Sequence, residues 1–89
     1  MDTTKKRIEA LMDYVNEKGY TMTIADIANV SETIDGIRER LEDIDEDFPE
    51  KDTVIEYLKC LSDVIRKTPY FNLVSNILIG LNGIMGLLK

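Results

Sequence analysis

Hydrophobic residues recur every three or four positions along most of the chain, which is the spacing that places side chains on one face of a helix. In the first segment this spacing joins four apolar residues: Ile8, Leu11, Met12 and Val15. Asp2 or Thr3 can cap its first turn, and Gly19 follows where a left-handed residue would end a helix. The pattern therefore predicts an amphipathic helix over residues 3–18.

A second helix is predicted over residues 23–45, where the apolar stripe is longer and more regular. Its members recur at alternating steps of three and four, the heptad spacing of packed helices: Ile27, Val30, Ile34, Ile37, Leu41 and Ile44. Thr23 and Asp26 approximate a capping box at its start, with Asp in place of Glu. Gly36 and nearby β-branched residues lower the helix propensity, so a break near residues 29–31 is the alternative to one long helix.

A third helix is predicted over residues 49–67, beginning at Pro49, because proline suits the first helical position. Its main stripe, with the residues that widen it, is Val54, Ile55, Tyr57, Leu58, Leu61, Val64 and Ile65. The helix ends by Thr68, since the following Pro69 disfavours helical geometry there. Cys60, the only cysteine, is predicted to be a small buried hydrophobic residue of this helix.

A fourth helix is predicted over residues 70–88, and short loops separate the four segments. Short connections between amphipathic helices favour an antiparallel arrangement. A chain of 89 residues builds a single core. The sequence therefore predicts an all-α fold, a small antiparallel bundle of three to four helices that forms one domain.

The composition removes much catalytic chemistry. The chain has no histidine, so it lacks Ser-His-Asp and Cys-His nucleophile pairs as well as Cys2His2 zinc sites. No glycine-rich phosphate loop and no carboxylate pair on an apolar wall is recognisable. We therefore predict a protein that is not an enzyme and holds no cofactor. One cysteine and no apolar signal region after the N-terminus favour the cytoplasm.

Negative charge is concentrated between residues 39 and 52. This stretch has eight acidic residues against Arg40 and Lys51, so it carries the whole net charge of -6. A solvated helix end and loop is the simplest interpretation. The functional alternative is an acidic surface that steers a basic partner protein, such as one that binds nucleic acid in a groove this surface would occupy. The predicted partner-binding residues are Glu39, Glu42, Asp43, Asp45, Glu46, Asp47 and Glu50.

Part of the same stretch has the spacing of a calcium loop. Asp43, Asp45 and Asp47 match the first three ligand positions of an EF-hand. However, Phe48 stands where the loop requires Gly, and Val54 stands where it requires a bidentate Glu. No metal site is therefore predicted.

Residues 23–41 look like part of a helix-turn-helix regulator. Ile24-Ala25-Asp26-Ile27-Ala28 resembles a first helix, and Val30-Ser31-Glu32-Thr33 resembles the opening of a recognition helix, together covering about a fifth of the chain. The resemblance implies a DNA-binding regulator. DNA binding draws much of its affinity from Lys and Arg on phosphates, and Arg38 and Arg40 are the only basic residues here. Nucleic acid is therefore not the partner we expect, and the regulator stays an alternative.

Residues 68–88 contain no charged side chain, although asparagines and glycines interrupt them. Three glycines spaced by three, Gly80, Gly83 and Gly86, each cost roughly 0.8–1 kcal/mol of helix propensity and so predict close helix contact or a bend. The simplest interpretation is a buried helix. The alternatives are membrane association, which the absence of Lys and Arg disfavours, and a partner or homo-oligomer surface. That surface would comprise Phe71, Val74, Leu78, Leu81 and Met85.

Together these observations favour a small acidic protein-binding module that inhibits or regulates a partner. The acidic surface would supply orientation and association rate, and an apolar helix face would supply affinity. Small size, acidity and missing catalytic residues are shared with phage-type inhibitors of host or defence proteins and with immunity proteins, which is an analogy of class.

Overall fold

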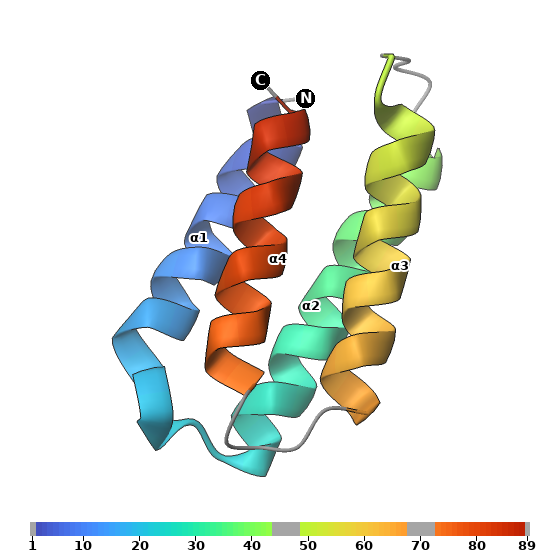
Figure 1. The fold of residues 1–89 in the computed structure, drawn as a ribbon. Coiled ribbons are helices and arrows are strands. Elements are labelled where there is room, and N and C mark those ends of the chain that lie inside the picture. Colours follow the sequence, from blue (N-terminus) through green and yellow to red (C-terminus); the bar gives the residue numbers. More distant parts are fainter. Residues whose placement is uncertain (1, 44–48, 68–72, 89) are drawn as a thin grey trace.

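The structure is a computed structural model that describes residues 2–43, 49–67 and 73–88. Its elements are the helices α1 (Asp2–Lys18), α2 (Ile24–Asp43), α3 (Lys51–Lys67) and α4 (Leu73–Leu87), with a short 3-10 turn, η1 (Gly19–Thr21), between the first two. Successive long helices run in opposite directions, so α1 begins and α4 ends at the same end of the bundle (Figure 1). The predicted all-α antiparallel bundle is confirmed, with four α-helices among the described residues.

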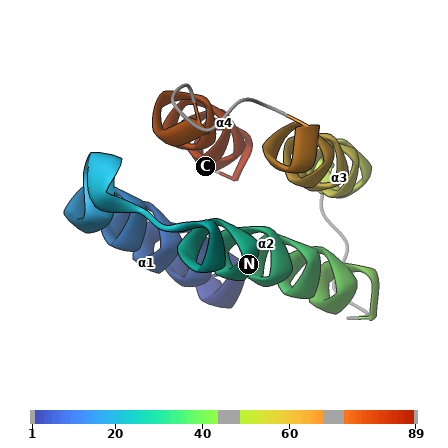
Figure 2. The same ribbon diagram turned by 90° about the horizontal axis from the view of Figure 1, so that it is seen from below.

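The helices form two layers. Seen along the bundle, α1 and α2 make one layer, and α3 and α4 make the other (Figure 2). The most extensive association is between α2 and α3, while α4 contacts both α1 and α3. Because each helix faces two neighbours, one side of every helix is left at the surface.

One hydrophobic core lies between the layers, and each helix contributes a stripe to it. The stripes follow the predicted spacing in the first three helices. The buried residues are Ile8, Leu11 and Val15 of α1, Val30, Ile34, Ile37 and Leu41 of α2, Val54, Leu58, Leu61 and Ile65 of α3, and Ile77, Leu81, Ile84 and Leu88 of α4 and its end. Met22, between α1 and α2, completes this core.

Two expectations for α3 are wrong. Val64 is 43% exposed although it was assigned to the apolar stripe. Cys60 is exposed as well, and so is not a small buried hydrophobic residue. The reason is geometric, because α3 buries only the sides that face α2 and α4, and these two residues lie on its outer side.

The middle of α2 is continuous. The helix passes through residues 29–31 without a break, and the Thr33 hydroxyl donates to the Asn29 carbonyl over 2.7 Å. That bond gives a β-branched polar residue an internal partner within the helix. One long helix is therefore confirmed, and the turn implied by the helix-turn-helix resemblance is absent from this segment.

Where the structure describes them, the ends of α1 and α3 at residues 18 and 67 are as predicted, and the other helix ends differ by one or two residues. Pro49 and Glu50 form a turn and α3 begins at Lys51, so Pro49 is not the first helical residue. The Val54 amide donates to the Glu50 carbonyl over 2.8 Å, which places the proline just outside the first hydrogen-bonded turn. The predicted end of α2 at residue 45 and the predicted start of α4 at residue 70 lie outside the described residues.

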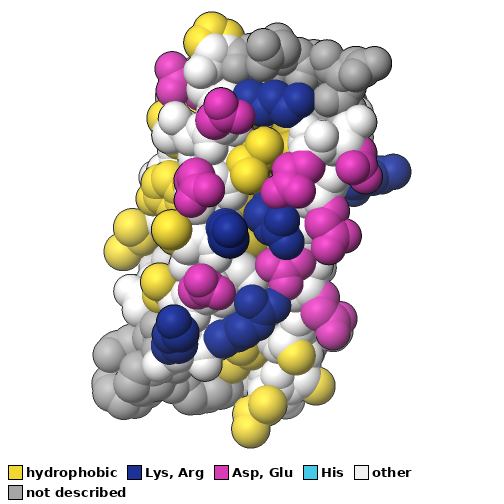
Figure 3. Space-filling view, turned by 90° about the vertical axis from the view of Figure 1, so that its right-hand side faces the viewer, with side chains coloured by type: hydrophobic (Ala, Val, Ile, Leu, Met, Phe, Trp, Pro, Cys, Tyr) yellow, Lys and Arg dark blue, Asp and Glu magenta, His cyan; other side chains and the backbone are white. Residues whose placement is uncertain are grey.

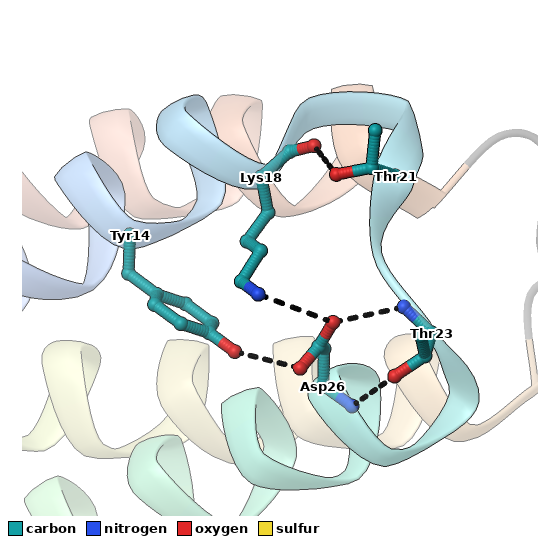
Figure 4. A network of polar contacts seen from close by, with 5 residues as sticks. All are labelled: Tyr14, Lys18, Thr21, Thr23 and Asp26. Carbon is teal, nitrogen blue, oxygen red and sulfur yellow. Dashed lines mark hydrogen bonds and ion pairs between the residues drawn. The ribbon is translucent and has the colours of Figure 1, made fainter.

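The start of α2 is fixed by the predicted capping box (Figure 4). The Thr23 amide donates to Oδ2 of Asp26 over 2.9 Å, and the Asp26 amide donates to Oγ1 of Thr23 over 3.1 Å. These reciprocal bonds satisfy amides that a helix start otherwise leaves unpaired. Gly19 has a φ of +51°, the left-handed geometry predicted for it, and lets the chain turn after α1.

Asp26 also joins α1 to α2. The Tyr14 hydroxyl donates to its Oδ1 over 3.0 Å, and Nζ of Lys18 lies 3.9 Å from its Oδ2 (Figure 4). The Thr23 amide, followed by the Tyr14 hydroxyl, holds the pKa of Asp26 below its usual value. Burial, reinforced by the hydrogen bond to Asp26, raises the pKa of Tyr14. A single carboxylate thus fixes the junction between α1 and α2.

Two of the three glycines of α4 lie in close contact with side chains of α3. A Cβ on Gly80 would lie 2.6 Å from a methyl carbon of Leu61, and one on Gly83 would lie 2.5 Å from the hydroxyl oxygen of Tyr57. The predicted close contact is therefore confirmed between α4 and α3 at these two positions. Gly86 differs, because nothing lies within 4 Å of its Cβ position.

Candidate functional site

Polar residues set the register of α2 on α3. The hydroxyl oxygens of Ser31 and Ser62 are 3.0 Å apart in the buried interface, and Arg66 donates to the Asp35 carboxylate. Burial opposes ionisation of Asp35, yet hydrogen bonds from Ser62 and Arg66 outweigh it and lower the pKa of Asp35. Because every polar partner must align, this contact holds α2 in one position.

The acidic corner, residues 39–52, lies where α2 ends and α3 begins. Its described acidic side chains are all exposed: Glu39, Glu42, Asp43, Glu50 and Asp52. The predicted residues Asp45, Glu46 and Asp47 lie outside the described residues. One member of the corner is partly neutralised, because Arg38 donates to Oε1 of Glu42 over 2.8 Å. That contact raises the pKa of Arg38.

The acids of the acidic corner lie at two helix ends of opposite polarity, the end of α2 and the start of α3. Glu50 and Asp52 flank the start of α3, where partial positive charge favours a carboxylate. Asp43 is the last residue of α2, where the last carbonyl groups carry partial negative charge, and Glu39 lies one turn earlier. An acid at such an end costs about 0.3–1 kcal/mol. Helix stability therefore accounts for the acids of α3 and, through Arg38, for Glu42 of α2, but not for Asp43.

Elsewhere the charges are mixed. The side of the bundle in Figure 3 shows acidic and basic side chains interspersed, with hydrophobic side chains gathered along the left edge. Arg66 is one example of such mixing, because it pairs with Asp35 and lies 3.8 Å from Asp63. The excess negative charge is accordingly a local feature of the corner and not a property of the whole surface.

The predicted contact residues of α4 do not form an exposed stripe. Leu81 is fully buried and belongs to the core, so it presents no surface in the single chain. Val74, Leu78 and Met85 are half-buried and pack against the core. Phe71 lies outside the described residues. The stripe faces inward because α4 rests on α1 as well as on α3.

A different face of α4 is exposed, and the prediction missed it. We call it the α4 outer face, and its members are Ser75, Ile79, Asn82 and Gly86. Ile79 is 69% exposed, more than any other large hydrophobic residue described apart from Ile24 at 81%. A signal was present in the sequence, because these residues recur at steps of four, three and four between the buried positions.

An open hollow of about 550 Å³ lies between α1 and α2. Leu11, Val30 and Ile37 lie at its floor, and Arg7 and Tyr14 are among its polar lining residues. The Tyr14 hydroxyl is already bonded to Asp26, and no carboxylate lines the hollow. It therefore offers apolar contact and one guanidinium group, without an acid–base pair.

Residues 2–43, 49–67 and 73–88 contain neither a metal cluster nor a membrane-spanning helix. No group of three or more His, Cys, Asp or Glu side chains there could hold a metal ion. Within the same described residues, none of the helices has both the length and the apolar character needed to cross a membrane. Asp45 and Asp47, which carry the calcium-loop spacing, lie outside this range.

Comparison with protein-family models, curated proteins and solved structures found no match to this chain. Its function is therefore argued from its own geometry and charge.

Proposed function

We propose that this chain is a non-enzymatic protein-binding module whose acidic corner binds a basic surface of a partner protein. The observation that carries the proposal is the pair of exposed acids, Glu39 and Asp43, at the end of α2. Asp43 stands where the helix dipole disfavours it, and no ion pair to either acid is found among the described residues. Stability that is given up at a surface position is typical of a functional site.

The corner is also carried by a rigid element. Leu41 lies between the two acids in sequence and is fully buried, and Ile37 is 3% exposed. The polar contacts of α2 with α3 fix its register. Side chains on such an element meet a partner with little loss of conformational entropy, which favours specific recognition.

The partner chemistry that fits is a surface rich in Lys and Arg. Opposite charges steer encounter and orientation, and they act mainly on the association rate. A basic surface that otherwise contacts nucleic acid would be blocked by the corner, which is how an inhibitor of this size can act without catalysis. The analogy to phage-type inhibitors and immunity proteins rests on this mechanism and on class alone.

The test compares two double variants with the same change in formal charge. Glu39→Gln with Asp43→Asn neutralises the corner, and Glu9→Gln with Asp13→Asn neutralises two exposed acids of α1. A partner captured by the wild-type chain from a lysate is identified by mass spectrometry and purified. Its association rate with each variant is then measured at low and at high salt.

We expect the corner variant to associate about tenfold more slowly at low salt and to lose most of its salt dependence. The α1 variant should stay within about twofold of wild type. Equal slowing in both variants would show a dependence on net charge alone. Unchanged rates in both would show that the partner binds elsewhere. Either result would overturn the proposal.

A further inference from the structure

The hollow between α1 and α2 opens on the outer side of the layer that these two helices form (Figure 2). Its lining residues all belong to the two helices, and Ala10, Asn29 and Thr33 are exposed at its rim. Helices α1 and α2 contact each other less extensively than α2 contacts α3, which leaves space between them. The volume of about 550 Å³ lies within the range of about 300–1,000 Å³ that is typical of small-molecule pockets.

The polar groups of the hollow differ in whether they already have a partner. The Tyr14 hydroxyl donates to Asp26, and the Thr33 hydroxyl donates to the Asn29 carbonyl. The Arg7 side chain is half-buried, and no hydrogen bond or ion pair to it is found among the described residues. A guanidinium group binds a carboxylate through two parallel hydrogen bonds. A carboxylate is therefore the complement of the Arg7 end of the hollow.

The rest of the hollow is suited to an apolar chain. Leu11, Val30 and Ile37 form its floor, and Ala10 at the rim contributes only a methyl group. Arg7 and Tyr14 are two helical turns apart, so the hollow extends about 10 Å along α1. A second polar group on a ligand would meet hydroxyls that are already bonded, and a buried group without a partner costs free energy. The ligand that fits is elongated and apolar apart from one anionic end.

The acidic side chain at the Tyr14 end is already partnered (Figure 4). The Asp26 carboxylate accepts hydrogen bonds from the Tyr14 hydroxyl and the Thr23 amide, and it lies 3.9 Å from Nζ of Lys18. It is not among the residues that line the hollow. Because Lys18 offsets its charge, the repulsion that Asp26 exerts on an anion in the hollow is small.

Positive charge lies at the Arg7 end. Antiparallel packing brings the later turns of α2 beside the start of α1 (Figure 1). Arg40 is three residues after Ile37 and therefore lies on the same side of α2. Glu39 and Asp43 are two and six residues after Ile37, which places them on the far side of the helix. The potential at this end of the hollow therefore favours an anion.

We propose that the hollow binds a straight-chain fatty carboxylate, with the carboxylate on Arg7 and the alkyl chain along the apolar floor toward Tyr14. The pair of hydrogen bonds to the guanidinium orients the ligand, and burial of the alkyl chain supplies the affinity. The floor and Arg7 share no residue with the acidic corner. Failure of this proposal would therefore leave the proposed function untouched, and the reverse is also true.

The test uses octanoate and octan-1-ol, which have the same number of carbon atoms and differ in the end group. Each is titrated into the ¹⁵N-labelled chain at neutral pH, and binding is followed through the amide signals of residues that line the hollow. We expect octanoate to shift these signals and to saturate at one molecule per chain. Octan-1-ol should bind about tenfold more weakly, because it gives the guanidinium no counter-charge.

Two variants and two matched controls locate the site. Arg7→Gln removes the guanidinium group and Ala10→Leu fills part of the hollow, and each should weaken octanoate binding about tenfold. Lys6→Gln makes the same change of charge at an exposed neighbour, and Ala25→Leu enlarges an exposed alanine of α2, both outside the hollow. These controls should stay within about twofold of wild type. Binding of octan-1-ol should fall in Ala10→Leu and hold in Arg7→Gln. Circular dichroism verifies that each variant is folded.

Four results would overturn the fatty carboxylate site. One is a wild-type chain whose amide signals octanoate does not shift. Another is octan-1-ol that binds as tightly as octanoate, because Arg7 would then have no part in recognition. A third is octanoate binding that Arg7→Gln and Ala10→Leu leave unchanged, which would place the ligand elsewhere. The last is a hollow whose signals respond to a captured partner protein and not to octanoate, which would make it part of a protein interface.

Discussion

An aspartate lies at each end of α2, and the surroundings of the two aspartates have opposite effects on helix stability. At the start of the helix, Asp26 accepts a hydrogen bond from the Thr23 amide and one from the Tyr14 hydroxyl, with Lys18 nearby. At the other end, Asp43 is exposed and follows Glu42, beside carbonyl groups of like polarity. Helix dipole and hydrogen bonding thus favour the first aspartate and disfavour the second.

This difference distinguishes a carboxylate that stabilises the fold from one whose position the fold does not explain. In a protein whose local preferences agree with its fold, exceptions concentrate at functional sites. The start of α2 satisfies its local preferences, whereas its end departs from them at an exposed surface. The comparison holds only if the end of α2 is as firmly folded as its start, so that requirement is the first to test.

The largest expected effect comes from truncating one core residue at each end. Met22→Ala and Leu41→Ala remove side chains that are 1% and 0% exposed, and each should lower the free energy of unfolding by about 2–5 kcal/mol. Urea denaturation measures both. If Leu41→Ala cost under about 1 kcal/mol while Met22→Ala cost the full amount, the end of α2 would be frayed, and its acids would lose their significance.

The capping box predicts the next effect. Thr23→Ala removes the hydroxyl that accepts the Asp26 amide and should cost about 1 kcal/mol of stability. Thr33→Ala is the control, because its hydroxyl bonds only the Asn29 carbonyl within the helix, a contact that does not stabilise the helix, and alanine has the higher helix propensity there. Equal effects of the two changes would mean that the cap contributes nothing beyond propensity.

The capping box at the start of α2 could be predicted from the sequence, but the contact of this helix start with α1 could not. Thr23 and Asp26 are three residues apart, so a capping box follows from local geometry. Tyr14 is twelve residues from Asp26, and their contact depends on the angle between α1 and α2. No local pattern specifies that angle, which is why the prediction contained the cap and lacked the tyrosine.

The face that α4 presents was predictable only in part. Its apolar residues are numerous enough to give two stripes with the same heptad steps. One stripe is Val74, Leu78, Leu81 and Met85, and the other is Ile77, Leu81, Ile84 and Leu88. Periodicity alone does not choose between them, and packing against two neighbours selects the second. The same dependence on neighbours explains why Cys60 and Val64 of α3 are at the surface.

Neutralising the end of α2 should stabilise the protein slightly. Asp43→Asn removes an acid that opposes the helix dipole and should raise the free energy of unfolding by about 0.3–1 kcal/mol at low salt, and Glu39→Gln, one turn earlier, should raise it less. The gain should shrink near 1 M salt, where screening acts within about 3 Å. A loss of stability on either change would show that the acid has a stabilising partner and would remove the contrast with Asp26.

The smallest effect is a dependence on pH at the start of α2. Because its neighbours lower the pKa of Asp26 from 3.8, the folded chain holds the carboxylate ionised at pH values where the unfolded chain already protonates it. The resulting stability is complete above about pH 5 and is lost as pH falls through the unfolded value to the folded one. Urea denaturation between pH 3 and 6 measures the free energy of unfolding, and the excess of wild type over Asp26→Asn should therefore narrow on acidification. Tyr14→Phe removes one hydrogen-bond donor to Asp26. The difference in stability between Tyr14→Phe and the double variant Tyr14→Phe with Asp26→Asn should therefore narrow less on acidification.

If the difference in stability between wild type and Asp26→Asn stayed constant down to pH 3, the charge of Asp26 would be irrelevant to the cap. The two ends of α2 would then differ in hydrogen bonding alone.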